Sequence, residues 1–263
     1  MIHAEEVFVV FYKGTPLERI ALHGVSFSVQ QGEIISVVGN NGCGRSALLS
    51  FLAGHISSSF GKLWLDKMDI TSQTLFDRSM IFSSVFYDLN LGSAGNLTVA
   101  ENLALAGMHH QPHSIIKPAL TKEANDMFFE QLKNLDFMNM ELLLTEKVNL
   151  ISKAHRHVLA MLMAVIKGAK VLLIDEHSTG LDQKTAAMLL EATEKIIKSS
   201  GMTTIMAVND PKFSLDVADR TFVLSHGQIV SRLDKEAKKK MKPEDLVALF
   251  NLAPPPDAAE ARR

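Results

Sequence analysis

The chain of 263 residues contains a single cysteine, Cys43, so no disulfide can form within it. A lone thiol is typical of proteins from a reducing compartment. No apolar run reaches the ~20 residues that a helix needs to cross a bilayer. The N-terminus also lacks the charged-then-apolar layout of a signal peptide. These absences together lead us to expect a cytosolic protein.

The sequence has no excess of charge of either sign. Lysine and arginine number 27 against 29 aspartate and glutamate residues, which gives a formal net charge of −2. A protein without a global positive field is not expected to bind nucleic acid through phosphate contacts. The length allows one domain with a subdomain, or two small domains.

A glycine-rich segment between a predicted strand and a predicted helix is the most informative stretch. Residues 33–38 form an apolar run that predicts a buried strand, and residues 47–53 predict a helix. Glycines let successive backbone N–H groups face inward, and the helix N-terminus adds partial positive charge. We therefore predict that this segment cradles a polyphosphate. Its residues are Gly39, Asn40, Asn41, Gly42, Cys43, Gly44, Arg45 and Ser46, followed by Ala47.

The segment follows the pattern G-x-x-x-x-G-K-[ST] with one departure, because Arg45 stands where lysine is expected. Arginine keeps the charge but replaces a compact ammonium with a wide planar fork. We expect phosphate binding to survive and catalysis to suffer. From this stretch alone, a plain glycine turn is the alternative. Cys43 allows two interpretations, a redox-sensitive nucleotide site or a small residue at a variable loop position.

A second apolar run, residues 170–175, leads to two acids, Asp175 and Glu176. Ligands of parallel α/β sheets collect at the carboxyl ends of strands, so these acids are expected over the glycine segment. Asp175 would hold Mg²⁺ together with the Ser46 hydroxyl, and Glu176 would polarise an attacking water. Taken singly, either acid could instead cap a strand in solvent.

Other regions leave alternatives open. Tyr12 follows an alternating apolar pattern that predicts strands, and it suits either stacking on a base or ordinary sheet packing. Residues 98–148 are predicted to be mostly helical, with helices at 99–106, 122–135 and 138–144. The histidines at 109, 110 and 113 fit a metal site or a solvated loop. The lysine-rich segment 234–242 fits contact with anionic lipid headgroups or a solvated helix face.

Four motifs in order resemble those of the nucleotide-binding subunit of an ABC transporter, and the likeness runs from Val7 to Phe250. Residues 39–46 resemble Walker A, 171–176 resemble Walker B, 178–182 resemble the D-loop, and 151–157 occupy the place of the L-S-G-G-Q-R-Q signature. Residues 91–94, 101–106 and 175–179 further resemble single-domain subunits of bacterial importers that depend on a substrate-binding protein.

The resemblance implies an α/β fold, a P-loop NTPase of ABC type. It has a mostly parallel sheet core, an N-terminal antiparallel β subdomain and an inserted helical subdomain at about 98–157. Residues 1–250 would be the nucleotide-binding domain and 251–263 a disordered tail. Two subunits would hold ATP and Mg²⁺ between Walker A of one and the signature, with Ser152, of the other. The implied partners are a second nucleotide-binding subunit, integral membrane permease subunits and an extracytoplasmic substrate-binding protein, with the chain peripheral on the cytoplasmic face of the inner membrane.

Several positions depart from the family pattern. Lys153 and Ala154 replace the two signature glycines, Tyr87 replaces the Q-loop glutamine, and Asn209 replaces the switch histidine. Ser46, Asp175, Glu176 and Asp182 are as the family has them. Because phosphoryl transfer depends on positioning and electrostatics, we expect nucleotide binding with slow or absent hydrolysis. The chain is then either an altered ATPase that drives transport or a non-hydrolytic subunit paired with an intact partner, as a homodimer or a heterodimer.

Overall fold

The computed structural model describes residues 1–85, 92–108, 120–175 and 180–251. These residues divide into two compact units. The described part of the first unit comprises residues 1–82, 173–175 and 202–251, and that of the second comprises 83–85, 92–108, 120–172 and 180–201. In this part of the chain no helix is both long and apolar enough to cross a membrane.

The first unit contains an antiparallel sheet of order β2-β1-β4-β5. The alternating pattern near the N-terminus predicts strands there, and the family resemblance implies their antiparallel arrangement. Ile2 pairs with Val29 on one side and with Leu65 on the other, and all three side chains are buried. Residues spaced by two along these strands therefore share the core face. The strands are β1 (Ile2–Phe11), β2 (Arg19–Val29), β4 (Phe60–Leu65) and β5 (Met68–Asp69).

A second sheet has the order β10-β9-β3-β8-β7-β6. Of its last two strands, only residues 173–175 of β7 and residue 82 of β6 belong to the first unit. β3 lies parallel to both β8 and β9, and Val37 pairs with Ala207 and with Phe222. These results confirm the predicted α/β fold with a largely parallel core. The strands are β3 (Ile34–Val38), β6 (Phe82–Val85), β7 (Val171–Asp175), β8 (Thr203–Ala207), β9 (Arg220–Ser225) and β10 (Gln228–Leu233).

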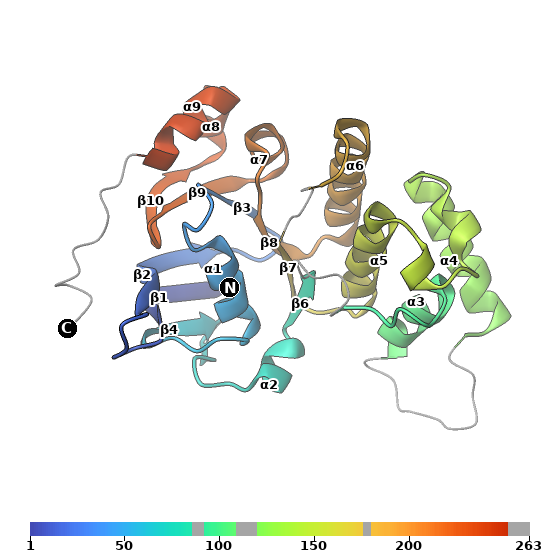
Figure 1. Ribbon diagram of the computed structural model, residues 1–263, viewed down its shortest axis with the longest axis horizontal. Helices are drawn as coiled ribbons and strands as arrows, with labels where there is room; N and C mark the ends of the chain where they lie inside the picture. The colour runs from blue at the N-terminus through green and yellow to red at the C-terminus, as the bar shows by residue number, and fades with distance from the viewer. Residues whose placement is uncertain (86–91, 109–119, 176–179, 252–263) are drawn as a thin grey trace. The chain divides into compact units, whose positions relative to one another are not determined.

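Short helices complete the first unit (Figure 1). The first of them contacts β2 of the antiparallel sheet and β8 of the parallel sheet, and its residues Leu48, Phe51 and Leu52 are buried. A helix that follows β8 packs on β3. The helices are α1 (Arg45–Ala53), α2 (Leu75–Ser79), α7 (Pro211–Val217), α8 (Lys235–Lys239) and α9 (Pro243–Ala248), with the 3-10 turn η4 (Leu249–Asn251).

The second unit is helical, and α5 contacts both α3 and α6 in it. One prediction here is wrong. Residues 138–144 do not form an α-helix, because Met138 and Asn139 adopt left-handed backbone conformations and only residues 140–143 make a 3-10 turn. The elements are α3 (Val99–Gly107), α4 (Lys122–Leu135), η2 (Met140–Leu143), η3 (Val148–Leu150), α5 (Lys153–Ile166) and α6 (Gln183–Ser200).

Arg78 fixes the C-terminal end of α1. Its side chain is 1 % exposed and its guanidinium donates to four backbone carbonyls, those of Phe51, Leu52, Ile70 and Thr71. Burial lowers the pKa of Arg78 to about 10, so the side chain is still charged at neutral pH. One planar fork thus satisfies carbonyls from a helix end and from the loop after β5.

We expect Arg78→Met to lower the free energy of unfolding by about 3 kcal/mol, because buried carbonyls would lose their donors. Urea unfolding followed by far-UV circular dichroism measures this change. Arg232→Met is the matched control, since Arg232 is exposed and donates to the Ser26 carbonyl. The control should lose no more than about 0.5 kcal/mol. Equal losses in the two variants would contradict the proposed role of Arg78.

Candidate functional site

The segment of residues 39–46, here called the glycine loop, connects β3 to α1. Its first position admits only glycine. Gly39 has a φ of 154°, and a Cβ built on it would lie 2.0 Å from the carbonyl oxygen of Leu224 in β9. That separation is far inside van der Waals contact. The backbone of the loop therefore lies directly against β9, which a larger residue would prevent.

The end of the glycine loop is packed in the same way against β2. Gly44, the N-cap of α1, has a φ of 111°, and a Cβ on it would lie 2.5 Å from the carbonyl oxygen of Ala21. The Gly227 N–H donates to the Cys43 carbonyl at 2.8 Å, and the Arg19 guanidinium donates to the Gly42 carbonyl at 3.4 Å. The loop is thus held by β2 and by the turn between β9 and β10.

Cys43 is a packing residue of the loop. It is 6 % exposed, and burial raises the pKa of its thiol, although the nearby Arg45 charge opposes this. The thiol is therefore protonated at neutral pH, and its nucleophilicity is low. Of the two interpretations made from the sequence, these facts favour the small buried residue over the redox-sensitive site.

Arg45 connects the glycine loop to the end of β8. Its Nη1 donates to the Val208 carbonyl at 2.7 Å in a partly buried bond, and the Val208 N–H donates to the Val37 carbonyl at 3.0 Å. Val208 immediately precedes Asn209, which is exposed. The arginine at the expected lysine position is therefore bonded to the backbone beside a second predicted site residue.

The remaining predicted residues of the loop are accessible. Asn40, Asn41 and Ser46 are exposed and Ala47 is half-buried. The Asn40 amide donates to the side-chain oxygen of Asn251 in η4 at 2.9 Å. The contact with η4 could not be foreseen, because 211 residues separate the two asparagines.

Adjacent strands bring the other predicted site residues of the first unit to the glycine loop. β8 lies between β3 and β7, so Asn209 follows the strand next to the one that leads into the loop. Asp175 is the last residue of β7 and is half-buried. Glu176 and Tyr87 lie outside the described residues, as do the histidines at 109, 110 and 113.

These residues fit Mg-ATP. Gly39 and Gly44 let the loop lie against β9 and β2, the loop leads into the N-terminus of α1, and Ser46 at the start of that helix is exposed. Backbone N–H groups of the glycine loop would hold the phosphates. The Ser46 hydroxyl and the Asp175 carboxylate supply the oxygen ligands that Mg²⁺ prefers.

Tyr12 lies in a turn after β1, with a φ of 54°, and its side chain is 68 % exposed. The backbone N–H and the hydroxyl of Thr15 both donate to its carbonyl. Because the ring is uncovered, ordinary sheet packing does not account for it. Stacking on a base remains a prediction for this residue.

Ser152 belongs to the second unit and caps α5. Its hydroxyl accepts from the His155 backbone N–H at 3.3 Å and bonds to the His155 Nδ1 at 2.7 Å, while Ala154 is buried in the first turn. The apolar spacing of the sequence predicts a helix over residues 150–165, and α5 begins three residues later, at Lys153, because Ser152 is its N-cap. Serine followed three residues later by the bonded histidine is a capping signal that the sequence analysis missed.

Asp182 caps α6, and its carboxylate accepts from the Thr185 N–H at 3.0 Å. Hydrogen bonds from Thr185 hold the pKa of Asp182 below its usual value. Both signature-region and D-loop residues thus begin helices of the second unit.

Known proteins resemble the chain in sequence and in fold. The family model described as "ABC transporter" matches residues 22–179. The tyrosine transport ATP-binding protein of Clostridioides difficile is 33 % identical over 229 residues, which are 87 % of this chain and 90 % of that protein. The spermidine/putrescine import ATP-binding protein PotA of Protochlamydia amoebophila is 30 % identical over 212 residues, 81 % of this chain and 53 % of that protein.

Among solved structures, the ATP-binding cassette MJ0796, a dimer in a post-hydrolysis state bound to ADP and Pi, has a TM-score of 0.74 at 20 % identity. The match covers 89 % of this chain and 99 % of that one, and it shows a shared fold. The glycine loop, the strand order and the sequence matches agree, and the chain belongs to the ABC transporter family as an ATP-binding subunit.

Proposed function

We propose that the chain binds Mg-ATP at the glycine loop, hydrolyses it slowly, and serves as the ATP-binding subunit of a bacterial importer. The observation that carries this proposal is the closed packing of the loop, in which Gly39 and Gly44 approach Leu224 and Ala21. A glycine loop that is fixed in this way at the start of a helix suits a phosphate, through its backbone N–H groups and the partial positive charge of the helix N-terminus. The residue roles are those stated above, with Asp175 and Ser46 for Mg²⁺ and Glu176 for the attacking water.

Slow hydrolysis follows from the state of Arg45 and Asn209. The Arg45 guanidinium is bonded to the Val208 carbonyl, so it has to leave a partly buried acceptor before it can meet phosphate. Asn209 has an amide that neither gives nor takes a proton near neutral pH, so it cannot replace a histidine in acid–base chemistry. Two supports of phosphoryl transfer are therefore weakened together.

The partners in this proposal are a second nucleotide-binding subunit, integral membrane permease subunits and an extracytoplasmic substrate-binding protein. The chain would be peripheral on the cytoplasmic face of the membrane, with Ser152 and the first turn of α5 facing the ATP of the second subunit. Support comes from relatives named for tyrosine transport and for spermidine/putrescine import, and from the dimeric cassette with ADP and Pi. Residues 1–250 would act as one nucleotide-binding domain whose helical subdomain covers about 98–157.

A second candidate is a non-hydrolytic subunit that binds nucleotide and pairs with an intact ATPase. The Arg45 bond to Val208 favours it, because a fixed guanidinium could leave binding possible while turnover is absent. In a heterodimer, this glycine loop could face a complete signature of the partner.

Phosphate release from Mg-ATP by the purified chain is the direct test. We expect turnover below about 0.1 s⁻¹, under the ~1 s⁻¹ at which ordinary enzymes begin. Glu176→Gln should abolish this turnover and leave ATP affinity within about twofold, because the carboxylate acts on water rather than on the nucleotide. Binding with no turnover in the wild type would favour the non-hydrolytic candidate. Absence of ATP binding would contradict both.

Arg45→Lys tests the departure in the loop. We expect tighter Mg-ATP binding and faster phosphate release, each by about tenfold, since a lysine does not hold the Val208 carbonyl through a fork and its ammonium suits a phosphate. Arg19→Lys is the matched control, because Arg19 also bonds to the loop, at Gly42. If the Arg45 variant resembles the control in both measurements, Arg45 is not what limits activity.

Gly39→Ala tests the contact between the loop and β9. The added methyl would meet the Leu224 carbonyl, so the loop has to move, and ATP affinity should fall by at least about 100-fold. Gly14→Ala is the control, since Gly14 has a φ of 76° but no atom within 4 Å of its Cβ position. The control isolates backbone strain from contact. Titration with fluorescent ATP measures the affinity of each folded variant. An unchanged affinity in Gly39→Ala would contradict the proposed phosphate site in the glycine loop.

A further inference from the structure

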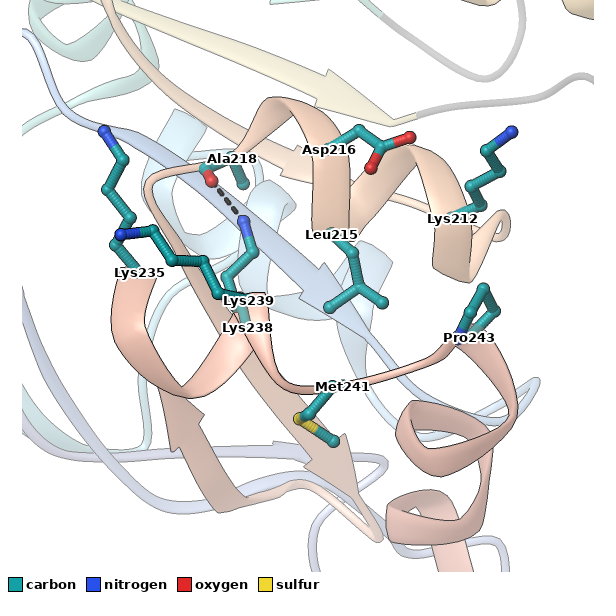
Figure 2. A pocket seen from close by; sticks show the side chains of 9 residues that line it. All are labelled: Lys212, Leu215, Asp216, Ala218, Lys235, Lys238, Lys239, Met241 and Pro243. Carbon is teal, nitrogen blue, oxygen red and sulfur yellow. Dashed lines mark hydrogen bonds between the residues drawn. The ribbon is translucent and has the colours of Figure 1, made fainter.

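A cavity of about 480 Å³ lies between α7, α8 and the start of α9 in the first unit. Its lining combines four lysines with apolar side chains. Lys212 comes from α7, and Lys235, Lys238 and Lys239 come from α8, while Leu215 and Met241 form apolar wall (Figure 2). The volume is within the range of small-molecule sites.

The lysines are not balanced by acids of the lining, where Asp216 is the single carboxylate. Figure 2 shows the Asp216 carboxylate on the side of Lys212, apart from the ammonium groups of Lys235 and Lys239. Lys239 is paired with the exposed Glu236 at 2.9 Å. The cavity therefore has a positively charged side formed by Lys235 and Lys238 of α8, with the Lys239–Glu236 ion pair beside them.

Lys238 is the unusual member of this group, because it is 6 % exposed. Its ammonium donates to the carbonyl of Ala218, a neutral acceptor, and in the described part of the chain no carboxylate lies within ion-pair distance of it. Burial lowers the pKa of Lys238, and the charge of Lys235 acts in the same direction, whereas Asp219 and Asp216 oppose them. A largely buried ammonium without a carboxylate in contact is stabilised when an anion enters beside it.

We propose that this cavity is a second anion site, which binds a phosphate group attached to an apolar or aromatic body. The lysine side would take the phosphate, and Leu215 and Met241 would cover the body. Lysine ammonium groups suit the several oxygens of a phosphate, since each offers three rotatable donors. A free phosphorylated metabolite and a phospholipid headgroup share this chemistry. The site is made from residues of α7, α8 and the segment before α9, none of which belongs to the glycine loop.

The probe for a free metabolite is phenyl phosphate, measured by isothermal titration calorimetry. The wild-type chain is compared with the double variant Lys235→Gln/Lys239→Gln, whose changes are exposed and should leave folding intact. Lys240→Gln is the matched control, since Lys240 is an exposed neighbour outside the lining. We expect about tenfold weaker binding in the double variant and less than twofold change in the control.

Two further measurements separate the sites and the sources. Binding of phenyl phosphate should persist in Gly39→Ala, which alters the glycine loop. In the wild-type chain, bound phenyl phosphate should shift the NMR resonance of the Met241 methyl group. In Lys238→Met the affinity should fall and this shift should be lost. Co-sedimentation with vesicles of phosphatidylglycerol and phosphatidylcholine tests the headgroup. If the chain binds the vesicles but not phenyl phosphate, and the double variant binds the vesicles more weakly, the ligand is a lipid. Equal weakening by Lys240→Gln, loss in Gly39→Ala only, or no binding of either probe would overturn the proposal.

Discussion

The site depends on two backbone contacts that exclude a side chain, those of Gly39 with Leu224 and of Gly44 with Ala21. They hold the glycine loop at both ends, one against β9 and the other against β2. β9, on which the loop rests, pairs with β3, the strand that leads into the loop. The loop is therefore fixed by the same sheet that brings Asp175 and Asn209 to its edge.

Behind the loop, the parallel sheet contains a buried polar cluster. The hydroxyls of Ser36, Ser214 and Thr221 lie 2.7 to 3.2 Å apart and connect β3, α7 and β9. Each hydroxyl can donate one hydrogen and accept others, so three of them satisfy one another without water. This cluster fixes α7 against the sheet, and α7 in turn carries one wall of the lysine-lined cavity.

Much of the fold could be predicted from the sequence because it rests on short-range patterns. Apolar runs predict β3 and β7, and the alternation near the N-terminus predicts strands there, whose antiparallel arrangement the family resemblance implies. The prediction of a helix over residues 138–144 failed because Met138 and Asn139 adopt left-handed backbone conformations, which the apolar spacing of the segment does not reveal. The start of α5 was missed because the capping role of Ser152 was not recognised. The Arg45 bond to Val208 joins residues 163 apart in the chain, so only the folded sheet could disclose it.

The two proposed anion sites of the first unit would use different hydrogen-bond donors. The glycine loop would use mainly backbone donors, so Arg45 can replace the expected lysine without abolishing phosphate binding there. In the glycine loop most of the attraction for phosphate would come from backbone N–H groups and the start of α1, which the replacement of lysine by Arg45 does not remove. A changed side chain at position 45 would then affect both ground-state binding and the stabilisation of the charge that develops during transfer, and it would abolish neither. The cavity at α7 and α8 has only lysine side chains for this purpose, so its affinity would depend on each of them and on ionic strength.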